Sequence, residues 1–65
     1  MRILVNGDWR DTPAAQLSAV LEELGYGQAV VSTAVNGEFV AAHARAHTAL
    51  ADGDHVEVLA PMQGG

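Results

Sequence analysis

The first group in this sequence that could do chemistry is the C-terminal carboxylate of Gly65, which ends the segment Pro61-Met62-Gln63-Gly64-Gly65. A C-terminal carboxylate is ionised at neutral pH and is a poor electrophile until it is activated. A mixed anhydride with a nucleotide supplies a leaving group, which a sulfur nucleophile can displace to leave a thiocarboxylate. Glycines suit this chemistry because a backbone without Cβ atoms can enter a narrow channel of an activating enzyme. We therefore predict Gly65 as the site of sulfur attachment, presented by a flexible tail that includes Gly64, Gln63 and Met62.

A Gly-Gly ending is weak evidence by itself. Glycine makes up about 7% of an average protein, so chance alone ends about one chain in 200 with this pair. The prediction therefore depends on the fold that would carry the tail.

Other side chains offer little chemistry. His43 and His47 are four residues apart and could share one face of a helix, but a metal site needs further ligands. The chain has no cysteine, and Asp52 and Asp54 are typical of a turn. We expect no metal site. No Ser-His-Asp set, phosphate-binding loop or acid pair stands out, so we expect a domain that is not itself an enzyme.

Composition restricts the partners. The chain has 65 residues, 49% of them hydrophobic, and a formal net charge of −5. The length and the hydrophobic content predict one folded domain. The negative net charge predicts that it binds neither nucleic acid nor a membrane surface. No segment has the length or flanks of a membrane span or signal peptide. We expect it in the cytoplasm. Without cysteine, any sulfur must come from elsewhere, and without lysine, self-conjugation is limited to the N-terminal amine.

Two hairpins are predicted. Met1–Val5 alternates as a strand, and an Asn6-Gly7 turn connects it to a second strand at Asp8–Asp11. A second Asn-Gly pair lies between the β-branched segment Val30–Val35 and Glu38–Val40, which indicates another two-residue turn.

One helix is predicted between the hairpins. Thr12 offers a capping oxygen, and Pro13 suits the first helical position, so we expect a helix over Pro13–Leu24 that ends at a left-handed Gly25. Its apolar residues have the i, i+3, i+4, i+7 spacing of a buried face: Leu17, Val20, Leu21 and Leu24.

The remaining residues predict a last strand. Ala41–Leu50 is alanine-rich and has no apolar stripe, so we expect a covering connection, and its conformation stays open. His55–Ala60 alternates as a strand, and Pro61 ends it.

This order of elements predicts an α+β, ubiquitin-like β-grasp fold. We expect a mixed four- to five-stranded sheet with one main helix packed on one face, and with the first and last strands parallel at its centre. Residues 1–60 would form the domain and 61–65 the tail. Alternation places Leu4 and Leu59 on the face away from the helix, on adjacent strands, and we expect an apolar partner surface there, beside the tail.

The sequence resembles the ThiS family of sulfur carriers in thiamine biosynthesis, over essentially the whole chain. The segments that carry the resemblance are residues 3–7, 34–40, 50–58 and 61–65: ILVNG, AVNGEFV, LADGDHVEV and PMQGG. The resemblance implies that Gly65 is adenylated by an E1-like (ThiF-type) adenylyltransferase that uses ATP and magnesium, while the domain itself binds no cofactor. It further implies a thiocarboxylate whose sulfur comes through a cysteine desulfurase and passes to a ThiG-type thiazole synthase. Many family members have proline and a basic residue after the segment that matches Phe39-Val40, where this chain has Ala41-Ala42-His43, which puts any partner contact there in doubt.

Two alternatives stay open. One is a related carrier for molybdopterin or another sulfur acceptor, which shares the fold and the Gly-Gly ending but is usually longer. The other is a non-catalytic ubiquitin-like binding module whose tail is inert.

Overall fold

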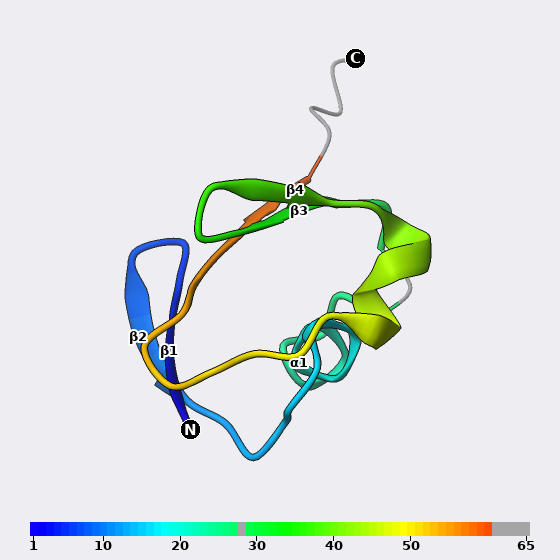
Figure 1. Ribbon diagram of the computed structural model, residues 1–65. Helices are drawn as coiled ribbons and strands as arrows, with labels where there is room; N and C mark the ends of the chain where they lie inside the picture. Colours follow the sequence, from blue (N-terminus) through cyan, green and yellow to red (C-terminus); the bar gives the residue numbers. More distant parts are fainter. Residues whose placement is uncertain (28, 61–65) are drawn as a thin grey trace.

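The computed structural model describes residues 1–27 and 29–60, and these form five strands and two short helices (Figure 1). The strands are β1 (Arg2–Val5), β2 (Asp8–Asp11), β3 (Ser32–Val35), β4 (Glu38–Val40) and β5 (His55–Leu59), and the helices are α1 (Leu17–Glu23) and the 3-10 helix η1 (Ala42–His47). Within the described ranges, no helix has the length and hydrophobicity that a membrane crossing requires.

The strands form one sheet in the order β2-β1-β5-β3-β4. β1 and β5 pair in parallel, and every other neighbouring pair is antiparallel. The predicted mixed sheet, with the first and last strands side by side and parallel, is confirmed. A parallel pair needs a long crossover, and here the chain between β1 and β5 contains a strand of one hairpin, the helix and the other hairpin.

Both Asn-Gly turns form as predicted. Asn6 and Asn36 each have a φ of 50°, and the glycines that follow have φ values of 87° and 84°. A two-residue hairpin turn of this kind requires positive φ at both central positions, which asparagine tolerates and glycine adopts freely. β2 and β4 have the predicted bounds, whereas β3 begins two residues later than predicted, at Ser32.

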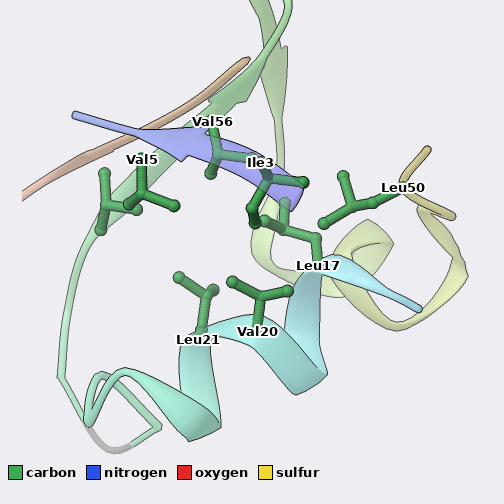
Figure 2. Close-up of a cluster of buried hydrophobic side chains, with 8 residues drawn as sticks. Ile3, Val5, Leu17, Val20, Leu21, Leu50 and Val56 are labelled. Carbon is green, nitrogen blue, oxygen red and sulfur yellow. The ribbon is translucent and has the colours of Figure 1, made fainter. Parts of the chain in front are cut away.

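The core lies between α1 and the sheet (Figure 2). Its buried hydrophobic residues are Ile3, Val5, Leu17, Val20, Leu21, Leu50, Val56 and Val58. The helical stripe and the strand alternation read from the sequence are thus confirmed, with Leu24 half-buried at the edge. Each fully buried side chain of this kind contributes about 1.5–3 kcal/mol, so the contact between helix and sheet dominates the stability of the domain.

The predicted start of the helix is wrong. α1 begins at Leu17, four residues after Pro13, and has no side-chain cap. The intervening backbone pairs with a distant segment instead: the Leu17 N–H donates to Thr48 O at 2.9 Å, and the Leu50 N–H donates to Ala15 O at 2.8 Å. These bonds use the backbone in an extended conformation, which excludes a helical turn there.

Thr12 therefore does not cap α1. Its side chain is buried, and its Oγ1 accepts a hydrogen bond from the Ala14 N–H at 3.0 Å, which closes a local turn. The other end of the helix is as predicted, since Gly25 has a φ of 90°. The Gly25 N–H donates to Glu22 O and the Tyr26 N–H to Leu21 O, at 3.1 and 2.7 Å, as in a Schellman motif.

The connection Ala41–Leu50, left open by the sequence, contains η1 and ends on the buried Leu50. Arg45 attaches η1 to the sheet: its Nε donates to Thr33 Oγ1 at 3.0 Å and its Nη2 to Val31 O at 2.6 Å. The Thr33 hydroxyl in turn donates to Val40 O at 2.8 Å. This chain of hydrogen bonds satisfies a fully buried threonine and fixes η1 against β3.

Candidate functional site

The predicted site of sulfur attachment, Gly65, lies outside the described residues, together with Gly64, Gln63 and Met62. The structure describes the base from which residues 61–65 continue, at the end of β5. Because β5 runs parallel to β1, its last residues lie at the same end of the sheet as the Asn6-Gly7 turn and at the opposite end from Met1 (Figure 1).

The end of β5 is held on both sides. On one side β3 pairs with it, with Ser32 opposite Leu59 and Thr33 opposite Val58. On the other side β1 has already ended, and the side chain of Asn6 takes its place: the Val58 N–H donates to Asn6 Oδ1 at 2.8 Å, and Asn6 Nδ2 donates to Val58 O at 3.0 Å. The sequence indicated Asn6 only as a turn residue. Nothing in the sequence indicated that its side chain would also pair with the backbone of Val58.

The start of β5 is held by the second turn. Asn36 Oδ1 accepts from the His55 N–H at 2.9 Å, and Asn36 Nδ2 donates to Asp54 Oδ1 at 3.1 Å. Asp54 Oδ2 also accepts from the Ala51 N–H at 2.8 Å. The hydrogen bond from the Ala51 backbone, followed by that from Asn36, lowers the pKa of Asp54. Asp54 thus forms the predicted turn through its charged carboxylate.

The face of the sheet away from α1 is rich in exposed apolar side chains. Leu59 is 64% exposed, Phe39 73% and Trp9 51%, and Val30 just before β3 is 81% exposed. Isolated exposed apolar residues are ordinary, but several on one face are typical of a binding surface.

Leu4 and Leu59 both lie on this face, as predicted, but they are not neighbours. Leu4 lies opposite Trp9 on β2 and His55 on β5, whereas Leu59 lies four residues further along β5, opposite Ser32. Four residues of a strand span about 13 Å. The single patch expected from the sequence is therefore two separate apolar groups.

The first group surrounds Leu4. The rings of Trp9 and His55 meet edge to face at a centroid distance of 6.3 Å, although their strands are separated by β1. They flank Leu4, which is half-buried. The Arg2 guanidinium lies 5.4 Å from the centre of the Trp9 ring, a cation–π distance. Trp9 thus covers the outer face near the β2 edge, with Leu4 beneath it.

The second group is a shallow hollow beside the base of the tail, lined by Val30, Val31, Ser32, Leu59 and Ala60. The hollow includes Ala60, the last described residue. An incoming protein that covered the Leu59 side chain would therefore also lie beside the point from which residues 61–65 continue.

The two histidines of η1 do not form a site. In a 3-10 helix, residues four apart point in directions about 120° apart, so His43 and His47 do not share one face, and both are exposed. Across residues 1–27 and 29–60, no group of three or more His, Asp or Glu side chains could hold a metal ion. The segment Ala41-Ala42-His43, which departs from the family pattern, forms the junction between β4 and η1.

The arrangement defines the class of the protein: a five-stranded mixed sheet with one main helix on one face is a ubiquitin-like β-grasp domain. The model of the ThiS family matches residues 3–65. The chain therefore belongs to the ThiS family of sulfur carriers.

The solved structures that are similar over the whole chain include two from one organism. The crystal structure of a thiamine biosynthesis protein (ThiS) from Geobacter metallireducens has a TM-score of 0.83 at 35% sequence identity, with 100% of both chains covered. The NMR solution structure of a thiamine biosynthesis protein from the same organism has a TM-score of 0.79 at 33% identity, covering 100% of this chain and 88% of that one. No curated protein matches the sequence.

Proposed function

We propose that this chain carries sulfur as a thiocarboxylate on Gly65 and donates it for the thiazole ring of thiamine. The observation that carries the proposal is the family match, which continues through the tail to residue 65 and so includes both terminal glycines. The similarity to thiamine biosynthesis proteins over the full chain supports the same pathway.

The proposed chemistry has three steps. The Gly65 carboxylate attacks the α-phosphorus of ATP on an E1-like, ThiF-type adenylyltransferase, and pyrophosphate leaves. A persulfide sulfur supplied through a cysteine desulfurase then attacks the acyl adenylate, AMP leaves, and reductive cleavage of the S–S bond by a thiol leaves the thiocarboxylate. ATP and magnesium belong to the activating enzyme. The carrier is a protein co-substrate of that enzyme and of a ThiG-type thiazole synthase, and the proposed location is the cytoplasm, because activation consumes ATP.

The outer sheet face is the proposed partner surface. Leu59 and the hollow around it are exposed beside the base of the tail, so an enzyme that contacts them also meets the residues that enter its channel. Leu4 lies between Trp9 and His55 and is half-buried, so its proposed role in this surface is to support the two exposed rings.

The direct test is conversion of the purified chain by the activating enzyme, ATP, magnesium and a sulfur donor. Replacing oxygen by sulfur changes the nominal mass as much as oxidising one methionine does, and Met1 and Met62 can both be oxidised. Accurate mass or thioacid-specific alkylation is therefore needed. We expect conversion of the intact chain and none of a chain lacking Gly65.

Genetics separates the alternatives. Loss of the gene should abolish growth without thiamine. If it abolished molybdoenzyme activity and left thiamine synthesis intact, the carrier would serve molybdopterin. If a chain lacking Gly65 restored growth, the tail would be inert and the domain would be a binding module.

A further inference from the structure

We propose that Asn6 is a positioning residue for the tail: its side-chain amide completes the pairing of β5 beyond the end of β1 and so fixes the direction of the end of β5, from which residues 61–65 continue. The catalytic part of this inference rests on the proposed function, because it requires that Gly65 be delivered to an activating enzyme.

The pairing between β1 and β5 is shorter than β5. The Leu4 N–H donates to Asp54 O at 2.9 Å and the Asn6 N–H to Val56 O at 3.0 Å. The regular parallel pattern would next require a carbonyl for the Val58 N–H and an N–H for the Val58 carbonyl. The chain turns away at Asn6-Gly7, so the backbone of β1 supplies neither.

The Asn6 side chain supplies both. Its Oδ1 accepts from the Val58 N–H and its Nδ2 donates to Val58 O, at 2.8 and 3.0 Å. A primary amide carries one acceptor and two donor hydrogens, so it can replace a backbone amide in this way, whereas a carboxylate would only accept and would repel the Val58 carbonyl.

The proposed role of this contact depends on its position near the end of β5. Val58 precedes the last described residue, Ala60, by two positions. Without the amide, only the pairing with β3 would hold the end of β5. A change in the direction of β5 would move the point from which residues 61–65 continue, relative to a partner docked against Leu59. A reaction that depends on positioning is slowed by errors of about 1 Å.

Asn36 provides a matched control. It has the same φ of 50°, lies in the same kind of turn, and its side chain also makes two hydrogen bonds, at 2.9 and 3.1 Å. Those bonds hold the start of β5, at the opposite end from the tail. Glycine tolerates the positive φ at both positions, so Asn6→Gly and Asn36→Gly remove comparable hydrogen bonds without backbone strain.

The experiment compares the full-length variants in two measurements. Amide hydrogen exchange of Val58 reports the contact directly, and we expect it to become at least about tenfold faster in Asn6→Gly but not in Asn36→Gly. Steady-state kinetics of thiocarboxylate formation should show kcat reduced about tenfold in Asn6→Gly, with KM within about twofold of the wild-type value, because the docking surface is intact. Asn36→Gly should keep the wild-type kcat. If Asn6→Gly does not fold, Asn6→Asp, which keeps the acceptor and loses the donor, takes its place.

The outcomes are distinguishable. Equal kcat values for the two glycine variants, or unchanged protection of the Val58 amide, would overturn the inference while wild-type conversion still supported the proposed function. Absence of any thiocarboxylate on the wild-type chain would refute the proposed function and the catalytic part of the inference together.

Discussion

Replacing Leu59 by glutamate should weaken docking to the activating enzyme and leave the domain folded. Full burial of a leucine side chain is worth about 1.5–3 kcal/mol. Leu59 is 64% exposed, so the fold uses about a third of that, about 0.5–1 kcal/mol, and the remaining two thirds, about 1–2 kcal/mol, is available to a partner. Since 1.4 kcal/mol corresponds to a factor of ten in affinity, the loss in docking should be about 5- to 30-fold.

The assay is pyrophosphate release by the E1-like enzyme as a function of carrier concentration. We expect KM to rise by that factor with little change in kcat, and thermal unfolding to remain cooperative. Ala46→Glu is the matched control, because it adds the same charge to an exposed residue of η1, on the helix side of the molecule. Its KM should stay near the wild-type value. An unchanged KM in folded Leu59→Glu, or an equal rise in Ala46→Glu, would refute the assignment of docking to the outer face.

Two further predictions concern stability. Leu17→Ala should lower the free energy of unfolding by about 2–5 kcal/mol, because the side chain is fully buried. This is a large part of the about 3–10 kcal/mol expected for a domain of this size. The half-buried Leu24→Ala should cost clearly less, and equal urea midpoints for the two variants would contradict the observed packing. Asp54→Asn tests the lowered pKa of Asp54. The charged carboxylate stabilises the folded state above the ordinary pKa of an aspartate, and this contribution is lost as pH falls through the lower pKa of the folded state. Urea unfolding between about pH 2 and 7 should therefore show a smaller loss of stability at acid pH in Asp54→Asn than in the wild type, and identical pH profiles would count against the two hydrogen bonds.

The parts of the fold that could be predicted are those with local causes. An Asn-Gly pair between two short segments of alternating pattern determines a hairpin almost by itself, and β2 and β4 have the predicted bounds for that reason. The start of α1 could not be predicted in the same way. Thr12 and Pro13 form a valid local start signal, but the backbone of residues 15–17 is used by pairing with residues 48–50, more than 30 positions away. No local pattern reports such a contact.

The site shows the same limit. Alternation correctly assigned Leu4 and Leu59 to the outer face, because face depends only on odd or even position. Their separation depends on the register of β1 against β5, which places Leu4 beside His55, and a single sequence contains no measure of that register. The contact between Asn6 and Val58 was missed for the same reason, since it exists only because β1 ends before β5 does.

The place of β5 in the sheet has a consequence for how the protein is made. β5 follows both hairpins in the chain but lies between them in the sheet. During synthesis from the N-terminus, β1–β2 and β3–β4 are therefore two separate ribbons with no strand to join them, and isolated two-stranded ribbons are at best marginally stable in water. The complete sheet can form only when β5 has emerged and pairs with both β1 and β3. The strand that supports the tail is thus also the strand that completes folding, so a molecule that presents an ordered base for its tail is one whose whole domain has already assembled.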